Sequence, residues 1–209
     1  MLDIRFEEAA KRFQYEWVFR NLSLEIEAAS KWAITGANGS GKSTLLKCIS
    51  GLIPFTSGKI TYHIAGKEIP IEAVYTKLAF SAPYMELPEE FSLTELLKFH
   101  FNFKKPSIAL EEIPNLMYLH EHRHKPISQF SSGMKQRLKL GLCLFSDVPL
   151  LLLDEPTSNL DEKGVAWYQK MIEEHAGDRT VIVCSNDPKE YEFCNHILSV
   201  ENFKQKQKL

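Results

Sequence analysis

The distribution of apolar residues along the chain predicts a series of strands. Two β-rich runs open the sequence, LDIRFEEAAKRF at 2–13 and VFRNLSLEIEA at 18–28. Further short apolar or β-rich runs, several of them bounded by turn residues as strands usually are, lie at 31–35, 56–74, 77–82, 150–156, 180–185 and 196–202. The run at 150–156, LLLLDEP, begins with four consecutive leucines between two prolines. This pattern is typical of a strand that is buried on both faces of a parallel sheet.

Helical spacing appears between these runs. KSTLLKCIS at 42–50 places Leu45, Leu46 and Ile49 on one face, and Gly51 is suited to the position just after the helix. Ser92 and Glu95 resemble a capping box. Further helices are predicted from this box to about residue 119, where Pro106 and Pro114 interrupt them, and then at 131–145, at 161–175 and from Pro188. The segment GANGSGKST at 36–44 also has the spacing G-x-x-x-x-G-K-[ST] of a P-loop. The fold class predicted is therefore α/β, with a P-loop NTPase core that has a mostly parallel sheet, an N-terminal antiparallel β part and a helical insertion at about 92–147, all in one domain, 1–209.

Composition narrows the class of protein. The 209 residues are 44% hydrophobic and carry a formal net charge of −2, so the chain can bury one core and offers no electrostatic basis for binding nucleic acid. No apolar stretch approaches the roughly 18 residues of a membrane span, and acidic residues stand where a signal peptide would be apolar. The four cysteines lack zinc-ligand spacing and are typical of buried thiols in a reducing compartment. A cytoplasmic protein is expected.

The segment GANGSGKST at 36–44 has the spacing of a phosphate-binding loop, G-x-x-x-x-G-K-[ST]. Its glycines allow a tight loop whose N–H groups turn toward phosphate oxygens, and the helix that follows directs its positive end at the same anion. Lys42 would contact the β- and γ-phosphates, and the Ser43 hydroxyl would bind Mg²⁺. The predicted nucleotide-binding residues of this loop are Gly36, Asn38, Gly39, Ser40, Gly41, Lys42, Ser43 and Thr44.

Two carboxylates follow the predicted buried strand at 150–156. Asp154 and Glu155 stand at its carboxyl end, where α/β sheets bind their ligands. Asp154 suits Mg²⁺ coordination through water, and Glu155 suits a general base that orients and deprotonates an attacking water. Together with Lys42 and Ser43, they predict a site that binds ATP and Mg²⁺ and hydrolyses the nucleotide.

Taken in order, the motifs resemble those of the nucleotide-binding subunit of ATP-binding cassette (ABC) transporters. The resemblance covers nearly the whole chain through Walker A at 36–44, the turn and strand TSGKI at 56–60, the signature FSSGMKQR at 130–137, Walker B at 150–156 and the D-loop SNLD at 158–161. The family implies two cassettes that pair head to tail around two ATP molecules. Ser131 and the Gly133 N–H, at a helix N-terminus, would then contact the γ-phosphate held by the other subunit. The dimer would drive membrane permease subunits.

Three positions depart from the family pattern. Asn186 stands where the family has its switch histidine, and an asparagine cannot carry a proton at neutral pH, so slow hydrolysis is expected. Pro83 stands at the place of the Q-loop glutamine, with Tyr84 and Glu86 as candidate substitutes. The signature has Ser132 where the family has a glycine. Such departures are expected in a subunit that hydrolyses ATP slowly, or in one that pairs with a different cassette.

Several aromatic and histidine residues leave alternatives open. The adenine stack is expected from Phe13, Tyr15 or Trp17, with Phe13 favoured by alignment to the family, and the other possibility is that these rings belong to the core. Three histidines in HEHRHK, at 120, 122 and 124, belong to an exposed connector or to a metal site. The apolar stripe LLKFHFNF at 96–103 packs into the helical part or against a membrane partner.

The main hypothesis is an ATPase subunit of an ABC transporter, peripheral on the inner face of the cell membrane. The subunit would bind ATP and Mg²⁺ and pair with a second cassette and with integral-membrane permease subunits. Two alternatives keep the motifs: a cytosolic cassette ATPase, for example in iron–sulfur cluster assembly, and a regulatory nucleotide-binding module with negligible hydrolysis. The transported substrate would be selected mostly by the membrane partner.

Overall fold

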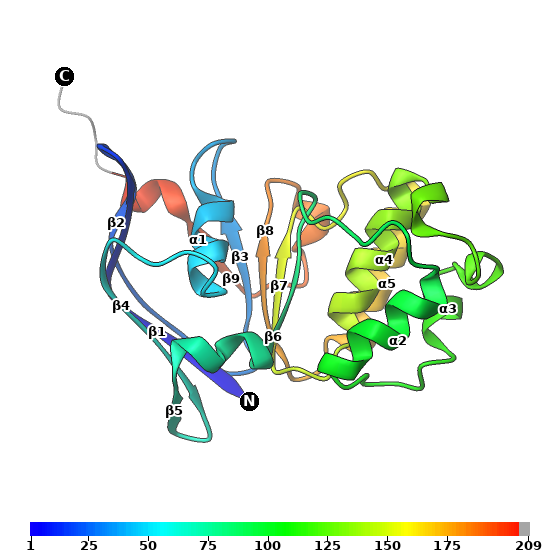
Figure 1. Ribbon diagram of the computed structural model, residues 1–209. Helices are drawn as coiled ribbons and strands as arrows, with labels where there is room; N and C mark the ends of the chain where they lie inside the picture. The colour runs from blue at the N-terminus through cyan, green and yellow to red at the C-terminus, as the bar shows by residue number, and fades with distance from the viewer. Residues whose placement is uncertain (205–209) are drawn as a thin grey trace.

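A computed structural model describes residues 1–204, so the last five residues of the predicted domain 1–209 lie outside the described part. An antiparallel sheet has the strand order β2-β1-β4-β5, and a second sheet, parallel throughout, has the order β6-β7-β8-β3-β9 (Figure 1). The strands are β1 (Leu2–Phe13), β2 (Glu16–Ile26), β3 (Lys31–Thr35), β4 (Ser57–Ile64), β5 (Lys67–Ile69), β6 (Leu78–Ser81), β7 (Leu150–Asp154), β8 (Thr180–Cys184) and β9 (His196–Ser199). The predicted α/β class, with an antiparallel N-terminal part and a parallel core, is confirmed.

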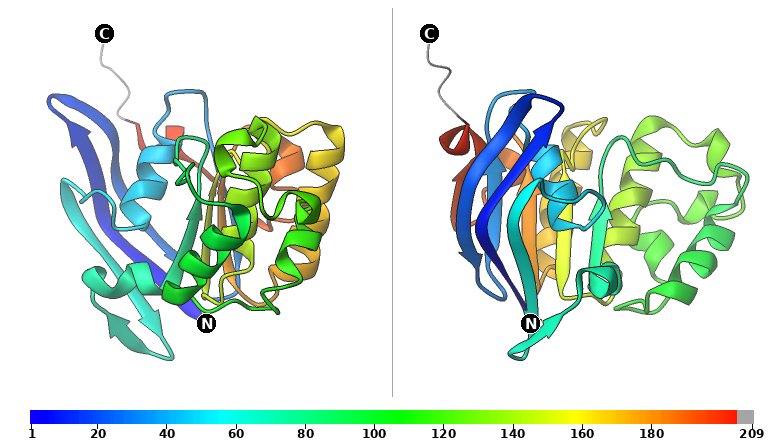
Figure 2. Two further views of the ribbon diagram at one scale, coloured as in Figure 1. Left: turned by 45° about the vertical axis from the view of Figure 1, so that its right-hand side comes forward. Right: turned by 60° about the vertical axis from the view of Figure 1, so that its left-hand side comes forward.

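The helices lie on both faces of the parallel sheet. They are α1 (Lys42–Ile49), α2 (Leu93–Phe103), α3 (Ile113–Leu116), α4 (Ser132–Leu144) and α5 (Glu162–His175). Short 3₁₀ segments cover Ile71–Lys77, His120–His122, Ile127–Gln129, Pro188–Glu190 and Val200–Phe203. Helix α1 lies between the two sheets, whereas α2 to α5 lie on the opposite side of the parallel sheet (Figures 1 and 2). Helices α2, α3 and α4 all fall between β6 and β7 in the chain, within the stretch predicted to be helical.

Strand β7 shows how the leucine run forms the centre of the molecule. Leu150 and Leu152 pack with α1 and the antiparallel sheet, whereas Leu151 and Leu153 pack with the helices on the other face. All four side chains are fully buried. Since burying one leucine contributes about 1.5–3 kcal/mol, this strand contributes strongly to the core and holds Asp154 in a fixed place at its carboxyl end.

Most element ends agree with the sequence pattern. Both hydrogen bonds of the predicted capping box of Ser92 and Glu95 are present, and Gly51 follows α1 with a positive φ of 77°. Two details differ. Pro114 lies in the first turn of α3, where a missing N–H costs nothing, rather than interrupting a helix. The end of the β-rich run 56–74 forms a 3₁₀ segment from Ile71, because Pro70 has no N–H to extend the strand pairing.

The structure shows the state of the cysteine thiols and the length of the helices. All four cysteines are free thiols, three of them buried. Within residues 1–204, no helix is both long enough and apolar enough to cross a membrane.

Candidate functional site

The phosphate-binding loop connects β3 to α1. Gly36, Gly39 and Gly41 have positive φ angles of 140°, 75° and 108°. A Cβ at Gly41 would lie 2.2 Å from a methyl carbon of Val18, so a larger residue at this position would both strain the backbone and collide with β2. The loop therefore depends on glycine for its shape. It places the first turn of α1 beside β2.

Lys42 closes this loop. Its Nζ donates to the carbonyl oxygens of Gly36 at 2.7 Å and Ala37 at 3.3 Å, and the side chain is buried. The N–H of Ala37 donates to Oε1 of Glu201 at 2.9 Å. A carboxylate oxygen thus already lies against one N–H of the loop, and the lysine charge is folded over its carbonyls. Both arrangements fit a loop built to surround an anion.

A cavity of about 360 Å³ opens beside the loop. It brings together most of the nucleotide-binding and catalytic residues that the sequence predicts: Phe13, Asn38, Gly39, Ser40, Gly41, Lys42, Ser43, Thr44 and Glu155. Gly36 is not among its lining residues but bonds to Lys42 through its carbonyl. The cavity is large enough for part of a nucleotide and has a polar floor formed by the loop.

Aromatic side chains border the outer part of this cavity. Phe13 is half exposed and Trp17 is partly buried, and both line it, whereas Tyr15 does not. The Nζ of Lys11 lies 4.9 Å from the centroid of the Phe13 ring. The guanidinium groups of Arg12 and Arg20 lie 5.1 and 4.5 Å from the Trp17 ring. Cations thus lie over both rings, two over Trp17 and one over Phe13, and Phe13 stays the residue predicted to stack on adenine.

Asp154 is the buried acid of the site. Burial raises its pKa, and the hydroxyls of Ser43 and Tyr84 oppose this shift. The Tyr84 hydroxyl donates to Oδ2 at 3.1 Å, whereas Oδ1 is buried and has no hydrogen-bond partner in residues 1–204. A buried oxygen without a partner, beside a serine hydroxyl at the start of α1, fits a Mg²⁺ site, since Mg²⁺ prefers oxygen ligands.

Glu155 follows directly and differs in its surroundings. It is exposed, lines the cavity and has a positive φ of 42°, while its N–H donates to the carbonyl of Cys184 at 2.9 Å. Left-handed backbone at a residue with a side chain is strained and is found frequently at functional positions. The strained turn moves Glu155 out of the sheet and toward the phosphate loop.

Asn186 and the signature residues lie at different distances from this cavity. Asn186 follows β8, and its Nδ2 donates to Oδ1 of Asn38 in the loop at 3.2 Å. Ser131 caps α4 by accepting from the N–H of Met134 at 3.2 Å, and Gly133 lies in the first turn. Neither Ser131 nor Gly133 lines the cavity, and Ser131 is exposed. Within one chain, the structure brings Asn186 to the loop but not the signature.

Four further side chains connect the parts of the site. Tyr84 bonds to Asp154, and Glu201 bonds to the phosphate loop. Gln136 on α4 donates to the carbonyl of Pro156 at 2.7 Å, and the buried Glu190 accepts from the N–H of Thr157 at 2.7 Å. Two of them carry a sequence signal: Gln136 as part of the signature, and Tyr84 as a candidate substitute for the Q-loop glutamine. The others join residues far apart in the chain.

The alternative metal site at the three histidines near residue 122 is wrong. In the described part of the chain, no three histidine, cysteine or acidic side chains lie close enough together to hold a metal ion. His122 packs beside Phe130 instead, with the ring centroids 6.3 Å apart.

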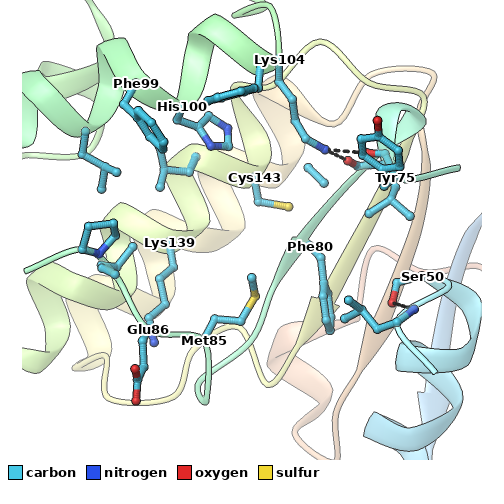
Figure 3. A pocket seen from close by; sticks show the side chains of 18 residues that line it. Ser50, Tyr75, Phe80, Met85, Glu86, Phe99, His100, Lys104, Lys139 and Cys143 are labelled. Atoms are coloured by element: carbon cyan, nitrogen blue, oxygen red, sulfur yellow. Dashed lines mark hydrogen bonds between the residues drawn. The ribbon is translucent and has the colours of Figure 1, made fainter. Parts of the chain in front are cut away.

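A second hollow, here called the α2–β6 groove, has a volume of about 470 Å³ (Figure 3). It lies where α2 and α4 face β6, and apolar side chains line most of it. Five of these apolar side chains are exposed: Leu52, Tyr75, Met85, Phe99 and Phe103. Lys104 and Lys139 lie at its edge, where they donate to the carbonyl oxygens of Tyr75 and Pro83 at 3.0 and 2.7 Å.

Comparison with known proteins decides the family. The model of the ABC transporter family matches residues 19–158. The chain belongs to this family. An uncharacterised ABC transporter ATP-binding protein of Bacillus subtilis, YybJ, is 32% identical over 84% of this chain and 82% of its own length. As a member of the family, the chain is an ATPase subunit of an ABC transporter that binds ATP.

Two further proteins show the range of similar cassettes. The cytochrome c biogenesis ATP-binding export protein CcmA of Mesorhizobium japonicum is 29% identical over 81% of this chain and 84% of its own. A dimeric ATP-binding cassette, solved in a post-hydrolysis state with ADP and Pi, is 20% identical. Its TM-score is 0.80 over 94% of this chain and 93% of its own, which shows the same fold. That cassette is dimeric, and the name of the CcmA protein describes it as an export protein.

Proposed function

We propose that the cavity beside the phosphate loop binds ATP and that Glu155 starts its hydrolysis. The observation that carries this proposal is that Lys42 and Glu155, from separate elements, line one cavity. The loop N–H groups and Lys42 would hold the β- and γ-phosphates. Glu155 would then take a proton from a water molecule that attacks the γ-phosphorus, and the bond to the ADP oxygen would break.

Ser43 and Asp154 would hold Mg²⁺ in this site. Their oxygen atoms are the right donors, and the unpartnered Oδ1 of Asp154 is the buried atom that such an ion would satisfy. When bound, Mg²⁺ would neutralise the charge that develops during phosphoryl transfer. Asn186, which follows β8, would orient the attacking water or the γ-phosphate without carrying a proton.

We further propose that two cassettes pair head to tail, with Ser131 and Gly133 completing the partner's site. Ser131 is exposed at the N-terminus of α4, a helix of 13 residues, and lines no part of the cavity in its own chain. A helix N-terminus with an exposed hydroxyl is suited to a phosphate oxygen. The dimeric cassette of the same fold supports this arrangement. The partner would be a second copy or a different cassette.

The α2–β6 groove is proposed as the face that binds the membrane permease. Phe103, Tyr75 and Leu52 are exposed by 76%, 66% and 63% of their surface. Apolar side chains that gather in one exposed hollow typically mark an interaction site. The subunit would then lie on the inner face of the membrane. The name of the CcmA relative supports transport in the outward direction.

Two alternatives remain distinct from this proposal. A cytosolic cassette ATPase would keep the cavity and lack a permease, and affinity capture from detergent-solubilised membranes of the host separates it from a transporter subunit. Recovery of a protein with several membrane spans supports the transporter, whereas recovery of soluble partners alone would contradict it. A regulatory module is favoured only by Asn186 and the missing Q-loop glutamine.

Glu155→Gln tests the catalytic proposal and separates it from the regulatory alternative. Because glutamine keeps the shape but cannot accept the proton, we expect phosphate release to fall by a factor of 10² or more while ATP binding remains. Phosphate release and equilibrium binding of a fluorescent ATP analogue measure the two effects. The matched control is Glu162→Gln, an exposed acid at the start of α5, which should change neither. Equal turnover of Glu155→Gln and the unmodified protein would refute the role of Glu155.

A further inference from the structure

The loop after β6 brings a tyrosine to the Walker B acid. Tyr84 belongs to the segment where the family has its Q-loop glutamine, and its hydroxyl donates to Oδ2 of Asp154 at 3.1 Å. The other carboxylate oxygen, Oδ1, is buried and has no hydrogen-bond partner in residues 1–204. One oxygen of Asp154 is therefore fixed by protein, and the other is left for a ligand.

Neighbouring elements hold the tyrosine ring in place. The Nζ of Lys47 on α1 lies 4.0 Å from its centroid, and Phe80 of β6 meets it edge-on at 6.5 Å. Tyr84 does not line the nucleotide cavity. It reaches Asp154 from outside that cavity, so its contact with the acid does not depend on a bound nucleotide.

We propose that Tyr84 is the positioning residue that replaces the Q-loop glutamine, holding Asp154 so that Oδ1 is presented to the Mg²⁺–nucleotide complex. This inference rests on the proposed Mg²⁺ site. Its chemistry differs from that of a glutamine, because the phenol donates to the carboxylate instead of offering an amide oxygen to the ion. Groups that orient a metal ligand by hydrogen bonds typically set a factor of 10 to 100 in metal affinity.

Glu86, the other candidate for this role, does not have the required contact. It lines the α2–β6 groove (Figure 3), whereas a side-chain hydrogen bond to Asp154 in residues 1–204 comes from Tyr84. A second carboxylate could not donate to Asp154 in its charged form, because both groups are acceptors. Of the two candidates for this role, Tyr84 is the one that donates to Asp154.

Tyr84→Phe removes the hydroxyl and keeps the ring that packs against Lys47 and Phe80. Mn²⁺ binding to the complex of the protein with ADP, measured by electron paramagnetic resonance, reports the metal site without hydrolysis. We expect Mn²⁺ to bind about tenfold more weakly in Tyr84→Phe, with the affinity for metal-free ADP unchanged. Tyr84→Gln, whose side-chain amide can donate to Asp154 as the phenol does, should recover most of the affinity. Glu86→Gln is the control and should bind Mn²⁺ as the unmodified protein does.

Two outcomes would overturn the role of Tyr84. Unchanged Mn²⁺ affinity in Tyr84→Phe would show that the hydrogen bond does not position the acid. Tighter binding would show that the phenol competes with the ion for Asp154. If the unmodified protein with ADP binds no Mn²⁺ at all, the proposed metal site itself fails, so the two failures are distinguishable.

Discussion

Asn186 is the residue proposed to limit the chemistry of the site. It is exposed after β8 and donates to Asn38 of the phosphate loop at 3.2 Å, so it lies within reach of a γ-phosphate held there. Its amide can donate or accept a hydrogen bond but cannot transfer a proton at neutral pH. In the proposed mechanism Glu155 accepts the proton from water, and Asn186 is a neutral hydrogen-bonding group beside the loop.

Asn186→His should therefore raise the hydrolysis rate. A histidine at this place can share its proton with the γ-phosphate or the water, and positioned proton transfer contributes about 10²–10⁴ at most, so we expect roughly a tenfold gain. Steady-state phosphate release measures it. The double variant with Glu155→Gln should stay inactive, since the histidine assists and does not replace the base. Unchanged turnover in Asn186→His would refute the idea that Asn186 slows hydrolysis.

At the residue scale, short-range spacing reveals the groups that one segment brings together. The phosphate loop and the pair Asp154 and Glu155 each lie within a few positions, so their chemistry can be predicted from the sequence. The contact of Tyr84 with Asp154 spans 70 positions, and that of Glu201 with Ala37 spans 164. Such contacts depend on how strands order themselves in a sheet, which no local pattern encodes.

Helix α2 contains a histidine that couples stability to pH. Burial, followed by the charge of Lys104, lowers the pKa of His100, which lies 3.0 Å from Oγ of Ser146 through its Nε2. In the unfolded chain a histidine has a pKa of about 6.5. As pH falls below that value, the unfolded chain gains a proton that folded His100 resists, so the free energy of unfolding decreases until pH reaches the folded pKa.

His100→Gln should remove this part of the pH dependence. Glutamine does not titrate and can still hydrogen-bond to Ser146, so the variant should lose less stability than the unmodified protein between pH 7 and pH 5. Urea unfolding across this range measures the slope. His120→Gln, at an exposed histidine, is the control and should follow the unmodified protein. Parallel pH curves for His100→Gln and the unmodified protein would contradict the predicted coupling.

At the element scale, hydrophobic periodicity and end signals account for most of the structure. The leucine run forms a buried strand, and the capping box starts α2 one residue after Ser92, as predicted. The exceptions lie where local signals are ambiguous. The apolar run after Pro70 could extend a strand or turn away. Pro70 cannot donate to a strand partner, and the burial of Val74 in the same core as α1 favours the 3₁₀ segment.

The whole molecule has two apolar cores that share the parallel sheet. One lies between this sheet and the antiparallel sheet, around α1, and the other lies between it and α2 to α5. The continuous apolar runs of β7 and β8 predict strands with two buried faces, but they do not tell which element covers each face. The resemblance to a known family supplies that arrangement, because the order of the motifs fixes the topology. In this arrangement the ATP site lies beside the loop that follows β3, whereas the α2–β6 groove lies at β6, at the edge of the same sheet.

The central claim at the scale of the assembly is that each ATP site is built from two subunits. Lys42→Ala removes the phosphate-binding lysine of one subunit, and Ser131→Arg blocks the signature that it offers to the other. Each variant alone has no intact site. A mixed dimer of the two has one complete site, formed by the phosphate loop of the Ser131→Arg subunit and the signature of the Lys42→Ala subunit.

The measurement that tests this claim most directly is phosphate release from a mixture of the two inactive variants. If half the dimers are mixed and each has one working site of two, we expect about a quarter of the unmodified rate. A mixture of Lys42→Ala and Glu155→Gln is the control, because both changes fall in the loop and strand that one subunit supplies, so no dimer has a complete site. Recovered activity in the first mixture alone would support the shared site. No recovery from correctly folded variants would contradict it.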